Sequence, residues 1–281
     1  MSNVLLIHGG AGSDRSYIPK LEKYTVEASL LNTPLDQVVE AVRLMEDDPS
    51  FNAGTGSVKR IDGSIQMDAA VMTERRIGSV MAIERVRNPI LVSRKVMEET
   101  PHIILSGDGA TKFARALGFP DYDPTTERTQ EIWRKTQDFF RGKKVDLPPR
   151  YEEYRKFQHL FGLNLDTVGA VASVNGSFAA AVSTGGSSPM LRGRIGDSPV
   201  PGCGIYSGKK GAVVATGIGE EIIRNMLCYR IYEEIGERPL KDIISERISE
   251  FGKVLVGVIA VSENEHFSFA NSDMANALVQ K

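Results

Sequence analysis

Short apolar runs bounded by glycine, asparagine or charged residues recur along the chain and predict buried β-strands. The predicted strands cover residues 4–10, 64–72, 77–84, 102–107, 167–174, 177–184, 211–217, 254–263 and 265–272. Asn175 and Gly176 join two of these runs and are typical of a tight hairpin turn. The last two runs are expected to form a hairpin that closes the chain.

Other segments place their apolar residues at the spacing of an α-helix. Leu35, Val38, Val42 and Met45 follow this spacing, which puts their side chains on one helix face. The predicted helices cover residues 35–47, 88–99, 109–119, 220–236 and 240–252. Since strands and helices occur in groups instead of alternating regularly, the pattern predicts an α+β layered sandwich.

Residues 120–166 differ in character from the rest of the chain. They are rich in charge and proline and show little strand pattern, which predicts helical pieces within a mobile linker. A connection of this length inside a compact domain calls for a functional explanation.

Composition narrows the class of protein. The chain has 281 residues, of which 41% are hydrophobic and 25% charged, as in ordinary globular proteins. A net charge of −2 argues against a nucleic-acid binder, and no apolar run is long enough to span a membrane. Two cysteines without a cluster fit a reducing compartment, so we expect a cytoplasmic protein. The sequence has no HExxH or CxxC motif, which argues against a zinc enzyme. It also has no GxSxG motif, which argues against a serine hydrolase of that type.

Thr167 begins the apolar run 167–174, directly after the polar segment that ends in Asp166. One interpretation is a β-branched residue that starts a strand behind a turn. The other is a catalytic nucleophile, because a threonine at a new N-terminus uses its own α-amine as the base and needs no histidine. An α-amine with a pKa of ~7.7–8.0 suits proton abstraction near neutral pH. The residues alone leave both interpretations open.

Two further segments each have two interpretations, one as a functional site and one as an ordinary structural element. Thr216 and Gly217 stand where a predicted strand runs into a helix, a place for either a tight turn or an oxyanion-binding site. The loop 183–204 is rich in glycine, serine and proline, as surface loops are, and contains Arg194 and Asp197. An arginine fork and an aspartate together suit a ligand that has both a carboxylate and an ammonium.

Eight segments, taken in order, resemble the plant-type L-asparaginase and isoaspartyl peptidase family of N-terminal-nucleophile hydrolases. They read HGGAG (8–12), FNAGTGSV (51–58), MDAAVM (67–72), VRNPILVSRKVME (86–98), DTVGAVA (166–172), STGG (183–186), GRIGDSPVPGCG (193–204) and TGIGE (216–220). No single segment is decisive, but eight in the family's order form a specific match that runs nearly end to end.

The resemblance implies a single domain over residues 1–281 that cuts itself between Asp166 and Thr167 into an α chain of 1–166 and a β chain of 167–281. Thr167 would be the nucleophile that hydrolyses asparagine or β-aspartyl peptides. The other implied site residues are Thr184 beside the nucleophile, Arg194 and Asp197 on the substrate carboxylate and amine, Thr216 and Gly217 in the oxyanion hole, and Asn52 near the nucleophile.

The resemblance also implies a four-layer αββα sandwich and a homodimer of αβ units. A member of this family is expected to need no cofactor, but the resemblance implies a loop whose backbone carbonyls hold a structural sodium ion. That loop would use Met45, Glu46, Asp48, Phe51, Ala53 and Thr55.

The residue before Thr167 is the reason for keeping two alternatives to the asparaginase hypothesis. Many asparaginases of this kind carry glycine there, whereas Asp166-Thr167 is typical of the related glycosylasparaginases. A glycosylasparaginase or protease-like relative with a larger substrate is therefore the first alternative. An unprocessed protein that binds amino acids without chemistry is the second. The loop STGGSSPMLRGR also departs from the family's lysine-containing loop, which leaves the width of the pocket open.

Overall fold

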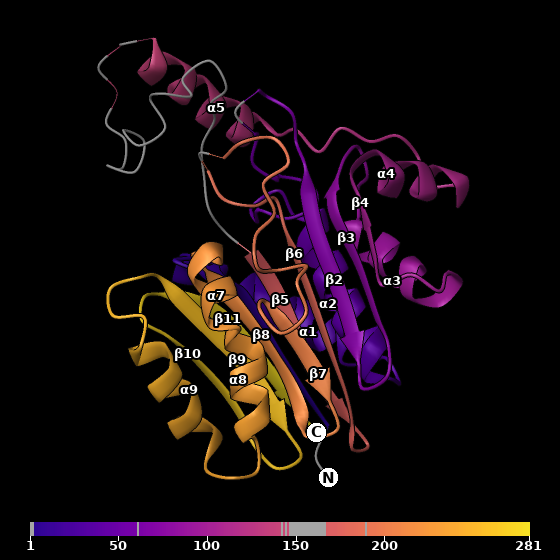
Figure 1. Cartoon of the computed structure of the whole chain (residues 1–281), viewed down its shortest axis with the longest axis vertical. Helices are drawn as coiled ribbons and strands as arrows, with labels where there is room; N and C mark the ends of the chain where they lie inside the picture. The colour runs from indigo at the N-terminus through magenta and orange to yellow at the C-terminus, as the bar shows by residue number, and fades with distance from the viewer. Residues whose placement is uncertain (1–2, 61, 142, 144, 146–166, 189) are drawn as a thin grey trace.

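The computed structural model describes the chain apart from residues 1–2, 61, 142, 144, 146–166 and 189 (Figure 1). Its strands form two sheets, and helices lie against both of them, so the chain is a mixed α+β protein. Within the described residues, no helix combines the length and the apolar character that crossing a membrane requires.

The larger sheet has seven strands in the order β11-β1-β5-β6-β2-β3-β4. All neighbours are antiparallel except β3 and β4. The strands are β1 (Val4–Ala11), β2 (Met67–Thr73), β3 (Ile77–Ile83), β4 (Ile104–Ser106), β5 (Thr167–Val174), β6 (Ser177–Thr184) and β11 (Met274–Gln280). The tight turn at Asn175 and Gly176, both with positive φ, joins β5 to β6 as the sequence predicts.

The smaller sheet has four antiparallel strands in the order β10-β9-β8-β7. They are β7 (Ile205–Gly208), β8 (Gly211–Gly217), β9 (Val256–Ser262) and β10 (His266–Ala270). A cluster of buried side chains joins the two sheets, with Val171 and Val182 from the larger sheet and Val214 and Ile259 from the smaller. Apolar burial between the sheets is why these strands read as continuous apolar runs.

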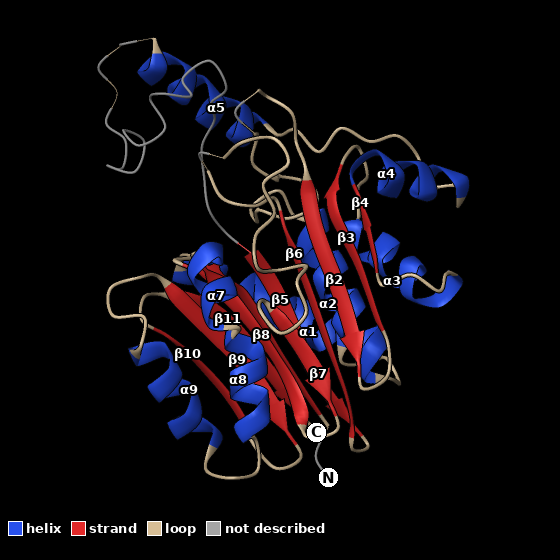
Figure 2. Cartoon of the chain, viewed as in Figure 1, coloured by secondary structure: helices blue, strands red, loops and turns tan. Residues whose placement is uncertain are grey.

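Helices cover the other faces of the two sheets (Figure 2). Those that contact the larger sheet are α1 (Ile18–Ala28), α2 (Pro34–Asp47), α3 (Pro89–Glu99) and α4 (Gly107–Ala116). Those near the smaller sheet are α7 (Gly219–Asn225), α8 (Leu227–Glu234) and α9 (Leu240–Ser249). A short 3-10 helix, η1 (Arg15–Tyr17), precedes α1, and α5 (Glu127–Phe140) lies beyond the strand ends at the top of Figure 1.

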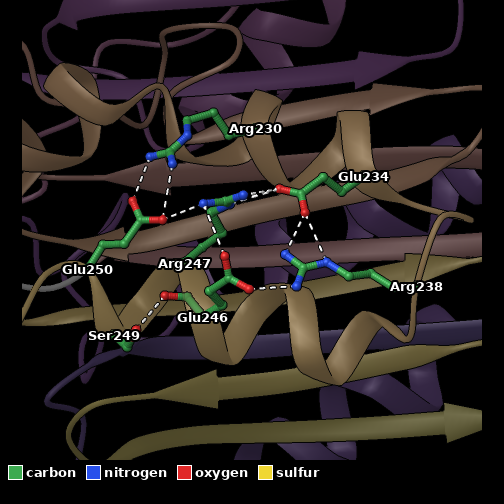
Figure 3. Close-up of polar contacts among 7 residues, drawn as sticks. All are labelled: Arg230, Glu234, Arg238, Glu246, Arg247, Ser249 and Glu250. Carbon is green, nitrogen blue, oxygen red and sulfur yellow. Dashed lines mark hydrogen bonds and ion pairs between the residues drawn. The ribbon is translucent and has the colours of Figure 1, made fainter.

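An ion-pair network joins α8 to α9 and the turn after it (Figure 3). Glu234 on α8 pairs with both Arg238 and Arg247, and Arg247 also reaches Glu250. Arg230 approaches Glu250 to 2.8 Å. Single exposed ion pairs contribute little, but shared partners in one network fix the geometry of several side chains at once. The network therefore holds these two helices in register over the smaller sheet.

The structure differs from the sequence prediction at several elements. The helix predicted over 220–236 is two helices, because Met226 adopts a left-handed conformation with φ 45°. The chain does not close on the hairpin of β9 and β10, since β11 follows and pairs with β1. Helix α1 and strand β7 were not predicted. In the predicted linker, α5 is a regular helix, and residues 146–166 lie outside the described part.

Candidate active site

Three polar side chains form one row across neighbouring strands of the larger sheet. Thr167 at the start of β5 is in register with Thr184 at the end of β6, which is in register with Asp68 on β2. Directly opposed residues on neighbouring strands share a face of the sheet. Thr167 Oγ1 donates to Thr184 Oγ1 over 3.1 Å, and the Gly186 N–H donates to the same oxygen over 2.9 Å.

A small cavity opens beside Thr167. Its volume is about 20 Å³, which is room for roughly one water molecule. The residues that line it are Ala11, Thr167, Thr184, Gly186, Ser187, Arg194, Gly196, Asp197, Ser198, Thr216, Gly217 and Leu255. It therefore brings together six residues that the sequence proposed from separate motifs: two threonines from the β5–β6 pair, two residues of the glycine-rich loop, and the pair at the end of β8.

Thr216 and Gly217 end β8 next to the glycine turn at the end of β1. The Ala11 N–H donates to Thr216 Oγ1 over 3.2 Å, which leaves the hydroxyl hydrogen of Thr216 for another acceptor. Gly217 has φ +143°, and a side chain there would collide with the Leu255 carbonyl oxygen. Only glycine fits this close approach of two backbones. The motif HGGAG (8–12) thus supports the end of β8 through Ala11.

Arg194 is held firmly at the cavity wall. Its Nε and Nη2 donate to the two carboxylate oxygens of Glu220, each over 2.9 Å. A methyl group at Gly196 or Gly219 would lie 2.8 or 2.9 Å from guanidinium nitrogens, so both glycines make room for the arginine. Burial opposes the charge of Arg194, but the bond to Glu220 and the neighbouring carboxylates outweigh it and raise its pKa. The guanidinium is therefore both charged and fixed in orientation.

Asp197 is a buried carboxyl at the same wall, with 4% of its surface exposed. Its Oδ2 atom has no hydrogen-bond partner among the described residues. Burial raises the pKa of Asp197 to about 7; the charge of Arg194 opposes this shift, while Glu220 and Asp68 add to it. A buried acceptor without a partner beside a cavity suits a cationic ligand group.

Asn52 connects the loop after α2 to the corner that carries Thr184. Its Nδ2 donates to the Gly186 carbonyl over 2.7 Å, and its Oδ1 accepts from the Val58 N–H over 2.9 Å. The Gly185 N–H donates to the Asn52 carbonyl over 2.8 Å. Asn52 is not among the residues that line the cavity; its bonds place it behind the corner of Thr184, and its role near the nucleophile stays a prediction.

Of the six residues with predicted sodium-binding carbonyls, Met45 and Glu46 lie in the last turn of α2, and the other four lie in the loop that follows it. The carbonyl of Glu46 accepts from the Thr55 N–H over 2.7 Å, that of Met45 from Asp48, and that of Asp48 from Phe51. Since a carbonyl oxygen has two lone pairs, these bonds leave room for a cation. The oxygen ligands fit sodium chemically, but several are already satisfied within the protein. The ion stays a prediction.

Two buried titratable side chains stand behind the site; the sequence pointed to Glu46 only for its backbone carbonyl and to His8 only as part of a motif. Glu46 is fully buried; its Oε1 accepts from Ser183 Oγ over 2.6 Å and from the Ile90 N–H over 3.0 Å. Burial raises the pKa of Glu46 to about 8, so it is mostly protonated at neutral pH. Burial likewise lowers the pKa of His8 to about 3, and the neutral ring accepts from the Gly10 N–H.

Sequence reasoning also missed one residue that lines the cavity and one that holds a lining residue in place. Ser198 lines the cavity with its hydroxyl 3.5 Å from Thr167 Oγ1, and Glu220 holds Arg194 from outside. Ser198 stands in the matched motif GRIGDSPVPGCG directly after Asp197, and Glu220 ends the motif TGIGE three residues after Gly217. Their positions in these motifs were the available signal. Asp166, on the other side of the predicted cleavage point, lies outside the described residues.

Comparison of the sequence with known proteins shows to which family the chain belongs. The profile of the family Asparaginase_2, described as asparaginase, matches residues 1–281. A plant-type L-asparaginase of Pyrococcus abyssi is 38% identical, with 95% of this chain and 92% of that protein covered. An isoaspartyl peptidase/L-asparaginase of Danio rerio is 36% identical, with 100% and 93% covered. A protein of the same name from Rattus norvegicus is 38% identical, with 80% and 68% covered.

Proposed function

The chain belongs to the asparaginase family and is a hydrolase, and from this premise we propose that Thr167 is its nucleophile. The substrates are L-asparagine, hydrolysed to aspartate and ammonia, and β-aspartyl dipeptides, cleaved at the isopeptide bond. The names of relatives that cover most of the chain support both activities.

One observation carries the proposal. The hydroxyl of Thr167 lies at the start of a rigid strand and donates to Thr184 Oγ1 over 3.1 Å, at a cavity that Arg194 and Asp197 also line. A nucleophile on a central strand is held in place by its neighbours, which catalysis of this kind needs. The strand-start interpretation of Thr167 is correct as well, because the residue opens β5.

The first chemical step joins Thr167 Oγ1 to the side-chain carbonyl carbon of the substrate. The α-amine of Thr167, free once the bond to Asp166 is cut, takes the hydroxyl proton. The carbon–nitrogen bond then breaks, and the amine returns the proton to the leaving ammonia or amino acid. Thr184 fixes the rotamer of Thr167 through the 3.1 Å hydrogen bond. The product of this step is an ester between Thr167 and the aspartyl group.

The second step transfers the aspartyl group to water. The α-amine of Thr167 takes a proton from the water, whose oxygen attacks the ester carbon, and aspartate leaves as Thr167 recovers its proton. In both steps a negative oxygen forms for a moment. The Thr216 hydroxyl and the Gly217 N–H, at the end of β8, are the donors we assign to it.

The substrate is oriented through its α-carbon groups. Arg194 binds the α-carboxylate while Glu220 holds its guanidinium from the other side. Asp197 binds the α-ammonium with the oxygen that lacks a protein partner. Arg194→Ala should therefore raise the KM for asparagine; an unchanged KM would show that this orientation is wrong.

Further features extend the proposal beyond the reaction. We propose a single domain with the four-layer αββα sandwich of N-terminal-nucleophile hydrolases, supported by two facing sheets and helices on their outer sides. Self-cleavage divides it into chains of 1–166 and 167–281, and two αβ units form a homodimer. A sodium ion in the loop 45–55 is part of the proposal. The two free, buried cysteines, Cys203 and Cys228, support a reducing compartment such as the cytoplasm.

The test is a substrate profile of the purified, processed enzyme. Ammonia release is measured with asparagine, amino-acid release with β-aspartyl-leucine, and sugar release with a glycosylated asparagine. We expect turnover of the first two substrates and none in the Thr167→Ala variant. Release of sugar alone would favour the glycosylasparaginase alternative, and an active Thr167→Ala variant would refute the assignment of the nucleophile.

A further inference from the structure

Arg60 is a buried cation beside the proposed active site, and it has no part in the two chemical steps of the proposed mechanism. Its side chain is completely enclosed, with 0% of its surface exposed. Nη2 donates to the Gln66 carbonyl over 3.0 Å, and Nη1 contacts the sulfur of Met190. Nε has no hydrogen-bond partner in the described part of the chain. A guanidinium has five N–H donors, so Arg60 has unused donor capacity inside the protein.

The guanidinium of Arg60 lies directly behind the cavity wall. A methyl group added at Gly186 would lie 3.1 Å from Arg60 Nη1 and 2.7 Å from the Met190 sulfur. Gly186 itself lines the cavity beside Thr184. Arg60 and Met190 therefore lie against Gly186, which itself faces the space next to the nucleophile.

Arg60 has no close carboxylate partner, although Asp68 is near enough to attract it. Burial lowers its pKa to about 10 and Asp68 opposes this shift, so the group stays charged at neutral pH. None of the ion pairs within the described ranges includes Arg60. Arg192, two residues after Met190, differs in this respect, because it pairs with both Asp62 and Glu84. Asp68, Asp62 and Glu84 favour the charged form of Arg60 from a distance, but none of them forms an ion pair with it among the described residues, so its unused donors are free for a ligand anion.

Arg60 and Arg194 also act on each other, since the charge of Arg194 disfavours the charged form of Arg60. Two guanidinium groups and the carboxyls of Asp68, Asp197 and Glu220 thus act on one another in this region. A β-aspartyl dipeptide has two carboxylates and one ammonium, which complements this set. Asparagine has one carboxylate and one ammonium and needs only Arg194 and Asp197.

We propose that Arg60 binds the carboxylate of the leaving amino acid when the substrate is a β-aspartyl dipeptide. This proposal rests on the proposed function, and it makes Arg60 the residue that favours β-aspartyl dipeptides as substrates. A thioether sulfur is a weak acceptor, so a carboxylate replaces it with a stronger, charge-assisted bond. Methionine has three rotatable bonds, and rotation of Met190 uncovers the guanidinium without moving the strands.

The first experiment needs no variant. The KM of the processed wild-type enzyme is measured for β-aspartyl-leucine and for β-aspartyl-leucinamide, whose leaving group lacks the carboxylate charge. A lost charge-assisted bond corresponds to a difference of at least tenfold, so we expect the amide to have a KM at least ten times higher. Equal KM values for acid and amide would overturn the proposal.

Arg60→Gln and Met190→Ala test the residue itself. In Arg60→Gln the ratio of the two KM values should fall to about one, and the acid dipeptide should lose at least tenfold more kcat/KM than asparagine. In Met190→Ala the KM for the acid dipeptide should fall, because the side chain that covers the Arg60 guanidinium is removed. Arg192→Gln is the matched control and should keep the wild-type ratio.

Three results would contradict the assignment to Arg60. A proportional loss with asparagine and the dipeptide in Arg60→Gln would mean that Arg60 only supports the fold. An unchanged acid-to-amide ratio in that variant would exclude contact with the leaving group. If Arg60→Gln does not fold, a Met190→Ala enzyme without improved binding of the acid dipeptide would refute the proposal. Failure of the proposed function is distinct, because then asparagine is not hydrolysed by the wild type either.

Discussion

The protonation of Asp197 should shape how substrate capture depends on pH. In the proposed mechanism its carboxyl must be charged to bind the substrate ammonium, and burial raises its pKa to about 7. The α-amine of Thr167, with an ordinary pKa of ~7.7–8.0, must be neutral to act as the base. The charges of the substrate's own α-carboxyl and α-amine stay constant between about pH 5 and 7. Two enzyme groups therefore have to lose a proton before the free enzyme can react.

The slope of the pH profile counts these two groups. Below about pH 6 both are almost fully protonated, so log kcat/KM should rise with a slope that approaches two, about a hundredfold per pH unit. Asp197→Asn removes one titration, and its slope should be one. At pH 8 the variant lacks one hydrogen bond between charged groups, worth about 1.5–3 kcal/mol. Its KM for asparagine should then be about 10–150-fold higher.

The assay is the initial rate of ammonia release from asparagine between pH 5 and 8.5. Intact mass first confirms that wild type and variant are cleaved to the same extent. Asp273→Asn is the control, since Asp273 is exposed and pairs only with Arg15 among the described residues; it should keep both the slope and the KM. A slope of two in Asp197→Asn, or a KM within twofold of wild type, would refute the role of Asp197.

Two further predictions concern the support of the site. Glu46 has a folded pKa of about 8 against an ordinary 4.5, so its contribution to stability is full at acid pH and lost as pH rises; unfolding free energy should fall by about 3 kcal/mol from pH 6 to 9. Denaturant titrations should show a fall that is smaller by about this amount in Glu46→Gln than in the wild type, because Asp197, whose pKa is also raised, still contributes in the variant. A methyl group at Gly169 would lie 2.5 Å from His8 Nε2 and 2.6 Å from Val214 Cγ1, so Gly169→Ala should destabilise by about 1–3 kcal/mol. Gly109→Ala, with nothing within 4 Å, should not destabilise; equal melting temperatures would contradict this packing.

The strands of the core were predictable because their burial on both faces leaves a strong apolar signal. β5, β6 and β8 match the predicted ranges for this reason. Strand β11 was missed because the two side chains it buries most, Ala275 and Ala277, are small and give a weak pattern. Its strand form depends on pairing with β1, which no local pattern reveals.

The break between α7 and α8 was also beyond a local pattern. The apolar spacing continues through Met226, so periodicity predicts one helix. In the structure, the N–H groups of Cys228 and Tyr229 donate to the carbonyls of Cys203 and Gly202. These partners, distant in sequence, satisfy the first turn of α8 and stabilise a new helix start.

The candidate site was predictable where motifs name the reacting groups, and not where burial decides. Thr167, Thr184, Arg194 and Asp197 line one cavity although their motifs are separate in the sequence. The partners of these groups depend on three-dimensional packing. Arg60 shows this most clearly, since an arginine in a polar stretch reads as a surface residue and is in fact completely enclosed.

Intact mass spectrometry of the purified protein tests the central claim most directly. Wild-type protein, fresh and after warm incubation, is compared with Thr167→Ala. We predict that the wild type separates into a chain of residues 1–166 and a chain that begins with Thr167, and that the variant stays one chain of 281 residues. A wild-type chain that remains whole while it hydrolyses asparagine, or a variant that is cut at the same bond, would contradict the account of Thr167 as an N-terminal nucleophile.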